Sequence, residues 1–293
     1  MAEPLFKWTG GKRRLFQKYN DLNFFPHPDQ FDTFVDLFFG AGAVTCWVHN
    51  LMPDKKLVIN DLNSELMLVY TQMRDNWAEF KDEYLRLANL FLSTPQDERK
   101  ELYNRHRDIY CFDYRQLSPA KEAAMLLVMM KINFNGIWKV YKKFKGRYST
   151  CPGNVNYKEG VFDIQKVEMF REMLLNATLY NLPFDCVPIP DNSWVYADPP
   201  YRQQVNQMYS SEFSDAMQVK LVHHLQNNSK IYALSNKEIG DNFWTNLIEP
   251  THINFLDHKY TCGNAGAINP VTEVLIKNYG EAPPEPVDLL SFL

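Results

Sequence analysis

The sequence predicts an α/β protein whose largely parallel sheet is interrupted by an inserted helical region. Short apolar runs alternate with segments of helical periodicity at both ends of the chain, which is the order of consecutive βαβ units. The length of 293 residues suits one large domain, or one domain carrying a smaller inserted one, and 45% of apolar residues is enough for a sizeable core. The formal net charge of −4 gives no global sign of nucleic-acid binding, so such a function must rest on local charge.

The spacing of apolar residues places the individual elements. The first strand ends in a Gly-Ala-Gly turn that leads into a helix, as at the start of a βαβ unit. The predicted strands lie at 34–39, 57–61, 178–182, 194–197 and 230–235, with a closing hairpin around 255 and 274–276. The predicted helices lie at 44–51, 62–91, near 97–107, at 121–132 and at 215–227. The helical middle is therefore predicted to be an insertion at about 72–165, and the proline-rich segment 281–286 a loosely ordered tail.

A change of composition marks the second half of this insertion. Residues 123–158 contain no Asp or Glu, although the chain as a whole is acidic. The cations of this stretch are Lys131, Lys139, Lys142, Lys143, Lys145, Arg147 and Lys158, and the interleaved aromatic residues are Phe134, Trp138, Tyr141, Phe144 and Tyr148. Cations neutralise phosphates and aromatic side chains stack or wedge when a base is extruded, so the stretch predicts contact with DNA. A merely solvated charged face is the alternative.

The strongest chemical signal is Asp198-Pro199-Pro200-Tyr201, directly after the predicted strand at 194–197. The amino group of adenine is a poor nucleophile because its lone pair is delocalised into the ring. A carboxylate and a main-chain carbonyl, that of Pro199, can accept its two hydrogens and favour a more electron-rich nitrogen. The ring of Tyr201 can stack on a base that has left the duplex. At the end of a sheet strand, where α/β proteins bind ligands, this motif predicts chemistry on an exocyclic amino group.

Two further motifs predict a nucleotide-like ligand. Glycines 40 and 42 let the backbone approach a ligand closely, and Asp61 ends the next strand, about where nucleotide-binding folds place a ribose-binding acid. The glycine pattern is shorter than G-x-G-x-x-G, which disfavours NAD. Near the N-terminus, a Gly-Gly turn lies between Trp8, which can pack on an adenine or methionine moiety, and Lys12, which can meet a carboxylate. The spacing is not that of a phosphate-binding P-loop, and a solvated basic segment is the alternative.

Taken together, the motifs resemble the Dam family of DNA adenine methyltransferases, also called class D12 or α-group N6-adenine enzymes. The motifs that carry the resemblance, in chain order, are Lys7-Trp8-x-Gly10-Gly11-Lys12, Asp36…Phe39-x-Ala41-Gly42, Asn60-Asp61-Leu62-Asn63 and Asp198-Pro199-Pro200-Tyr201. The likeness extends to Phe134-Asn135-Gly136…Gly146-Arg147-Tyr148…Pro152-Gly153, which resembles the family's β-hairpin that probes the target sequence. It extends also to Leu234-Ser235-Asn236, and to Lys259-Tyr260-Thr261…Asn264…Thr272-Glu273-Val274-Leu275-Ile276. It thus runs in order over most of the chain.

The resemblance implies methyl transfer from S-adenosylmethionine to N6 of an adenine flipped out of duplex DNA. The implied fold is a seven-stranded Rossmann-like methyltransferase sheet, formed by 1–71 and 166–293, with 72–165 as a target-recognition insert. The implied catalytic residues are Asp198, Pro199 and Tyr201. The implied cofactor-binding residues are Trp8, Gly10, Gly11, Lys12, Asp36, Phe39, Gly40, Gly42, Asp61 and Asp198. The implied DNA-binding residues are Lys7, Asn135, Trp138, Lys139, Lys142, Lys143, Lys145 and Arg147.

Two departures from the family pattern concern the target sequence. Members that recognise GATC carry an arginine soon after the Phe-Asn-Gly, where this chain has Lys139. Arginine pairs bidentately with a guanine edge, whereas lysine presents a point charge. The family's late Arg-Arg-x-Ile-Ser is replaced by Lys259-Tyr260-Thr261 followed by Cys262-Gly263. Both changes argue against GATC as the target and leave the chemistry unaffected.

Other readings remain open at the level of sequence. The amino group could belong to cytosine, RNA or a protein glutamine, although Asp before Pro-Pro-Tyr favours adenine; a catalytically silent DNA-binding homologue is a further possibility. None of the five cysteines forms a C-x-x-C pair, so no metal site is expected. The longest strongly apolar run, 123–130, is too short to span a bilayer, and the N-terminus lacks the layout of a signal peptide. A soluble protein of the bacterial or phage-infected cytoplasm is expected, with no membrane partner.

Overall fold

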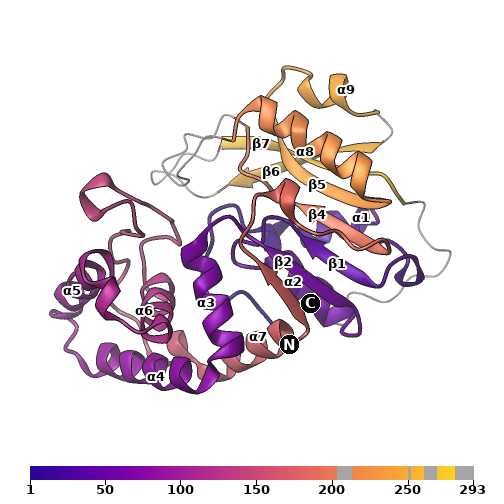
Figure 1. Ribbon diagram of the computed structural model, residues 1–293. Coiled ribbons are helices and arrows are strands. Elements are labelled where there is room, and N and C mark those ends of the chain that lie inside the picture. The colour runs from indigo at the N-terminus through magenta and orange to yellow at the C-terminus, as the bar shows by residue number, and fades with distance from the viewer. Residues whose placement is uncertain (203–212, 250–251, 261–268, 281–293) are drawn as a thin grey trace.

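A seven-stranded sheet forms the centre of the molecule (Figure 1). The computed structural model describes residues 1–202, 213–249, 252–260 and 269–280. The strands are β1 Thr33–Asp36, β2 Lys56–Asn60, β3 Ala177–Tyr180, β4 Ser193–Ala197, β5 Ile231–Glu238, β6 Ile253–Tyr260 and β7 Asn269–Lys277. Their order is β3-β2-β1-β4-β5-β7-β6, with β1 to β5 parallel and β7 antiparallel to both of its neighbours. The predicted α/β class, Rossmann-like sheet and closing hairpin are confirmed.

Both faces of the sheet are covered, which explains why its central strands are apolar throughout. Every residue of β1 and β4 is buried. Because side chains alternate between faces, Phe34 and Trp194 enter one hydrophobic core, while their neighbours Val35 and Val195 enter a second core on the other face. Trp194 is fully buried and lies within 4.8 Å of Phe34, measured between ring centroids. The strands thereby form a rigid base beneath the loops at their carboxyl ends.

Five α-helices lie between β2 and β3 in the chain; the first and the last of these contact β3, and the three between them extend away from the sheet (Figure 1). The second core packs the helix Asp215–Asn228, α8, against β4 and β5 through Leu221, Val222 and Leu225. The helices are α1 Phe16–Asp21, α2 Ala43–Leu51, α3 Ser64–Asp75, α4 Trp77–Ser93, α5 Arg99–Phe112, α6 Pro119–Lys131, α7 Ile164–Leu175, α8 Asp215–Asn228 and α9 Phe243–Leu247. Within the described residues, no helix is long and apolar enough to cross a membrane.

The predicted helix over 62–91 is wrong in one respect, because it is broken into α3 and α4. Asn76 lies at the break with non-helical dihedral angles. Its side-chain amide donates to Gln72 in the preceding helix and to Glu79 in the following one. Asparagine competes for hydrogen bonds in this way and favours helix ends. The apolar spacing continues across the break, so periodicity alone did not reveal it.

Helix α7 was not predicted, although Val167, Phe170 and Met173 on it are fully buried. The segment 133–153, called the recognition segment below, folds back on itself as the expected hairpin does. It has only two isolated bridges, Asn133 with Pro152 and Val140 with Tyr148, rather than regular strands. Its tip contains a short 3-10 helix, Lys142–Phe144.

The inserted helices share their core with the sheet. Helix α6 packs against both α3 and α4, and one continuous cluster of buried side chains extends from Phe34 in the sheet to Phe91 in α4. The chain therefore places the recognition segment, which follows α6, on a support that is continuous with the sheet. A division at 72 and 165 remains a prediction.

Candidate active site

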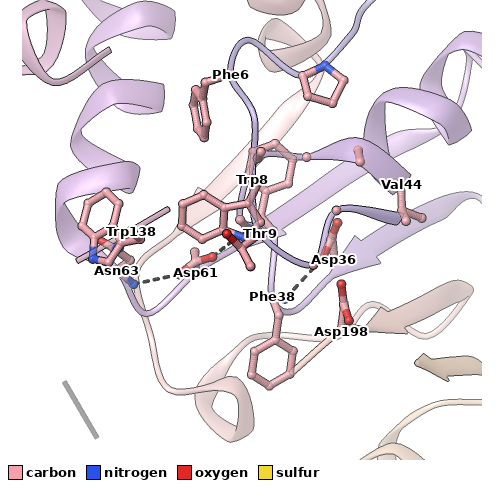
Figure 2. A pocket seen from close by; sticks show the side chains of 18 of the residues that line it. Phe6, Trp8, Thr9, Asp36, Phe38, Val44, Asp61, Asn63, Trp138 and Asp198 are labelled. Carbon is pink, nitrogen blue, oxygen red and sulfur yellow. Dashed lines mark hydrogen bonds between the residues drawn. The ribbon is translucent and has the colours of Figure 1, made fainter. Parts of the chain in front are cut away.

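Three loops meet at the carboxyl edge of the parallel strands. The turn at 39–42 follows β1, Asp61 follows β2, and the Asp-Pro-Pro-Tyr motif at 198–201 follows β4. Strand β1 lies between β2 and β4, which is the point where the strand order reverses and where open α/β sheets bind ligands. All three loops, with residues 8–12, line one cavity of about 1110 Å³. Figure 2 shows Trp8, Asp61 and Asp198 around this cavity.

The glycine turn is held by Asp61. The backbone N–H of Gly40 donates to Oδ2 of Asp61 at 2.7 Å, and the N–H of Asn63 donates to Oδ1 at 2.8 Å. Burial raises the pKa of the Asp61 carboxyl and these two bonds act in the opposite direction. The hydroxyl of Tyr70 donates to the carbonyl of Gly40 at 2.6 Å. The acid predicted to bind a ribose thus also fixes the turn beside it.

Both glycines of this turn are required by its geometry. Gly40 and Gly42 have φ angles of +51° and +76°, which residues other than glycine rarely adopt. A Cβ on Gly40 would lie 2.9 Å from Nε1 of Trp8. A Cβ on Gly42 would lie 2.4 Å from Cζ of Phe39. Trp8 therefore packs directly on the turn backbone, in space that a side chain at position 40 would occupy.

Asp36 supports the turn from below. Its side chain is 2% exposed; Oδ1 accepts from the N–H of Phe38 at 3.2 Å and Oδ2 from the hydroxyl of Thr45 at 2.6 Å. Burial raises the pKa of Asp36 to about 7, although both hydrogen bonds lower it. Both carboxylate oxygens are thus engaged within the protein, and Asp36 contributes the shape of the cavity wall.

Asp198 lies at the centre of a charged hydrogen-bond network. Nζ of Lys12 donates to both of its carboxylate oxygens at 2.6 Å, and the hydroxyl of Ser235 donates to Oδ1 at 3.0 Å. Lys12 is 2% exposed, whereas the Asp198 side chain is 22% exposed toward the cavity. Burial raises the pKa of Asp198, while the charge and hydrogen bond of Lys12 and the bond from Ser235 lower it. The sequence had suggested a cofactor carboxylate as the partner of Lys12; the structure pairs it with Asp198.

Tyr201 is tethered by a residue to which the sequence assigned no role. Its hydroxyl donates to Glu273 on β7, which is fully buried. Nζ of Lys12 lies 4.8 Å from the centroid of the Tyr201 ring. Glu273 therefore holds the hydroxyl end of the ring, and Lys12 lies over one of its faces. Glu273 was part of a recognised motif, yet only the pairing of β7 with β5 shows that it reaches Tyr201.

The recognition segment touches the N-terminal motif. The Trp138 ring lies 6.0 Å from that of Trp8 between centroids, and the hydroxyl of Thr9 donates to the carbonyl of Gly136 at 3.4 Å. A Cβ on Gly136 would lie 2.5 Å from Cβ of Lys7. Asn135, Trp138, Val140 and Gly146 line the same cavity as the three loops. The segment predicted to contact DNA is thus adjacent to the predicted cofactor site.

The predicted DNA-binding residues differ in where they point. Those that are exposed at the surface are Lys7, Asn135, Lys142, Lys143 and Lys145, and Lys139 is half-buried. Trp138 is 3% exposed and packs inside the protein. Arg147 pairs with Glu122 and lies 3.8 Å from Glu65, with its guanidinium stacked on Tyr114. The structure therefore places Trp138 and Arg147 where they hold the recognition segment in shape.

The late motif is described only in part. Ser235 and Asn236 lie on β5 and Glu273 on β7, but positions 261–264 of the motif lie outside the described residues. In the described ranges, no group of three His, Cys, Asp or Glu side chains is arranged to hold a metal ion.

Comparison with known proteins identifies the family. Residues 8–261 match the family model described as D12 class N6 adenine-specific DNA methyltransferase. The chain is similar to the type II methyltransferase M.MjaIII of Methanocaldococcus jannaschii, with 27% identity over 291 residues, covering 95% of this chain and 99% of the relative. It is also similar to the type II methyltransferase M1.LlaDCHI of Lactococcus lactis subsp. cremoris, with 29% identity over 299 residues, covering 94% of this chain and 95% of the relative. The chain belongs to the D12 class of N6 adenine-specific DNA methyltransferases.

Proposed function

We propose that the cavity holds S-adenosylmethionine and an extruded adenine next to each other, and that 198–201 is the catalytic motif. One observation carries the proposal: Asp198 and the turn at 39–42 line the same cavity, at the reversal of the strand order. A family member needs both a donor site and an acceptor-base site there, because the methyl group must pass directly between two bound molecules.

The residues present fit S-adenosylmethionine. Trp8 offers an aromatic face, Asp61 a carboxylate for ribose hydroxyls, and the turn at 40–42 forms the cavity wall on which Trp8 packs. The backbone at Gly10 and Gly11 continues the wall beside Lys12. When bound, S-adenosylmethionine supplies the methyl group as a sulfonium.

The chain's own residues act on the adenine amine. Asp198 accepts a hydrogen bond from one N–H of the N6 amine, and the carbonyl of Pro199 accepts a hydrogen bond from the other. These two bonds raise the electron density of the nitrogen. The ammonium of Lys12 and the hydroxyl of Ser235 favour the ionised form of Asp198. The ring of Tyr201, held through its hydroxyl by Glu273, stacks on the base. Lys12 and Ser235 hold Asp198 before the base arrives, so little reorganisation of this acceptor is needed.

The role of the turn is tested by Gly40→Ala. The added Cβ would displace Trp8, and alanine at this positive φ is strained, so the affinity for S-adenosylmethionine should fall by about tenfold or more. Isothermal titration calorimetry measures the affinity. Gly160→Ala is a matched control, because Gly160 also lines the cavity but a Cβ there meets no atom within 4 Å. Equal affinity in both variants would argue against the proposed cofactor site.

We also propose that the recognition segment holds duplex DNA through Lys139, Lys142, Lys143 and Lys145, assisted by Lys7. The three outer lysines are exposed around the tip of the segment, and their positive charge is not balanced by acids of the segment itself. On this proposal 72–165 serves as the target-recognition insert. Phosphate contacts of this kind position DNA and give binding its salt dependence.

Reversing two of these charges tests the surface. Lys142→Glu with Lys143→Glu should weaken DNA binding at low salt by about tenfold or more and reduce the salt slope by roughly two. Fluorescence anisotropy over a salt series measures both quantities. Lys56→Glu with Lys230→Glu makes the same charge change at exposed positions by the opposite edge of the sheet and should have a small effect. If Lys142→Glu with Lys143→Glu left the affinity for DNA unchanged at every salt concentration, the proposed DNA-binding surface would be wrong.

The Dam-like, α-group subclass is part of the same proposal, because the glycine motifs precede Asp-Pro-Pro-Tyr in the order of that subclass. The names of both relatives describe type II methyltransferases, which favours a role beside a restriction nuclease. Lys139 in place of arginine predicts a target other than GATC. Sequencing DNA from cells that express the protein, with N6-methyladenine identified base by base, should show one short methylated sequence; methylation at GATC would refute this prediction.

A further inference from the structure

The second proline of the catalytic motif is held by a buried glutamine from α8. Nε2 of Gln218 donates to the carbonyl of Pro200 at 2.9 Å. Gln218 is fully buried, although it lies in the first turns of an otherwise amphipathic helix. A buried amide in an apolar helix face costs free energy unless it is fully hydrogen-bonded, so its presence here calls for a purpose.

A second buried amide completes the clamp. Nδ2 of Asn236 on β5 donates to Oε1 of Gln218 at 3.2 Å, and Oδ1 of Asn236 accepts from the backbone N–H of Arg202 at 3.3 Å. The Pro200 carbonyl can only accept a hydrogen bond and the Arg202 backbone N–H can only donate one. These two groups therefore fix which way the side-chain amides of Gln218 and Asn236 point. Gln218 and Asn236 together hold the backbone on either side of Tyr201.

The side chain that follows the motif is fixed to the same helix. The guanidinium of Arg202 is 2% exposed and donates to Asp215, at the start of α8, and to Asp241. It also lies 3.8 Å from the centroid of the Phe243 ring. The motif is therefore attached to α8 at two points, through Pro200 and through Arg202.

The two proline carbonyls of the motif are consequently in different situations. The Pro200 carbonyl is directed to Gln218, inside the protein. In the part of the chain that the structure describes, no group donates a hydrogen bond to the Pro199 carbonyl. With φ fixed at each proline, the orientation of these two peptide groups depends mainly on ψ. Holding one carbonyl on α8 therefore restricts the direction of the other.

We propose that Gln218, supported by Asn236, is a positioning residue for methyl transfer: it holds the Pro200 carbonyl on α8 so that the Pro199 carbonyl stays directed at the adenine amine. The proposal rests on the proposed catalytic role of 198–201. It predicts an effect on the chemical step, because neither amide lies among the residues that line the cavity. Cofactor and DNA binding should therefore be nearly unaffected.

The test compares Gln218→Met and Gln226→Met. Methionine fills the space of Gln218 without its donor, and Gln226 is an exposed glutamine on the same helix. With unmethylated plasmid DNA and labelled S-adenosylmethionine, both saturating, Gln218→Met should lower the single-turnover rate and kcat by about tenfold or more, with KM for either substrate within about twofold. Gln226→Met should retain the original rate.

Gln218→Glu and Asn236→Asp are the second pair of variants. The first keeps the size of the side chain and the acceptor for Asn236. Burial raises the pKa of a carboxyl at this position, and the protonated form can donate to Pro200, so this variant should retain more of the rate than Gln218→Met. The second removes only the donor to Gln218 and should lose roughly threefold to tenfold. A full single-turnover rate in Gln218→Met would overturn the proposal. The proposal would also be overturned if the rate of each variant fell only in proportion to its folded fraction, measured by thermal unfolding, because this would indicate a purely structural role.

Failure of this inference is distinguishable from failure of the proposed function. If Asp198→Ala is inactive and Gln218→Met is fully active, only the positioning role is wrong. If Asp198→Ala keeps its activity, the catalytic assignment itself is wrong.

Discussion

Asp198→Ala should abolish methyl transfer, lowering kcat by about a thousandfold or more, while leaving the affinity for duplex DNA nearly unchanged. The carboxylate is proposed as the charged acceptor of the adenine amine. Among the described residues no other acid is placed in its position, because Asp36 is only 2% exposed, whereas the Asp198 side chain is 22% exposed, and Asp61 holds the turn at Gly40. The proposed DNA contacts lie on the recognition segment and do not involve Asp198. Transfer of labelled methyl groups and fluorescence anisotropy measure the two properties separately.

The loss must be separated from an effect on folding, since the alanine leaves the buried ammonium of Lys12 without its main partner. Breaking a buried ion pair on one side is more destabilising than removing both charges. Thermal unfolding of Asp198→Ala measures this cost, which Glu273 reduces because its buried carboxylate lies 3.8 Å from Nζ of Lys12. Asp198→Asn, which keeps the size of the side chain, should also be inactive. Turnover above roughly a tenth of the original in Asp198→Ala would contradict the catalytic assignment.

The meeting of the three loops was predictable from the sequence because it follows from topology. Carboxyl ends of parallel strands lie along one edge of a sheet, and Gly40, Asp61 and Asp198 each follow such a strand directly. The order of the motifs also predicted the D12 class and its activity on adenine in DNA, both confirmed by the family match. Local chemistry and strand order were sufficient at this level.

The internal partners of the site residues were not predictable in this way. Gln218 has no motif around it, and its bond to Pro200 depends on how α8 packs on β5. The pairing of Lys12 with Asp198 joins residues 186 positions apart, so no spacing rule could reveal it. Such contacts depend on the packing of elements that are distant in the sequence.

Charge pattern was similarly limited in the recognition segment. The absence of acids from 123–158 suggested that its cations, Arg147 among them, contact DNA. Arg147 instead turns inward, because Glu122 and Glu65, which lie outside that stretch, reach it from α6 and α3. The sequence predicts that a segment is basic, whereas the fold decides which of its cations are exposed.

Lys12→Met should shift the acid limb of the pH–rate profile to higher pH. Burial raises the pKa of Asp198, and Lys12 lowers it through its charge and its hydrogen bonds. Without the ammonium, burial is opposed only by the hydrogen bond from Ser235, so the pKa of the carboxyl rises further. The protonated carboxyl loses its negative charge and is a weaker acceptor for the amine. At any pH near the limb a smaller fraction of the variant is therefore active.

The measurement is kcat at saturating S-adenosylmethionine and DNA between about pH 5 and pH 9, since saturation removes any loss of cofactor affinity from the comparison. Arg13→Met is the control: it removes one positive charge from the same segment, but Arg13 is 71% exposed and pairs with Glu3 at the surface. Its acid limb should coincide with that of the original protein, because solvent screens an exposed charge. If the Lys12 variant also kept its limb, ionisation of Asp198 would not limit the rate. The polarisation of the amine would then depend on the Pro199 carbonyl, and the clamp formed by Gln218 would matter more than the charge beside it.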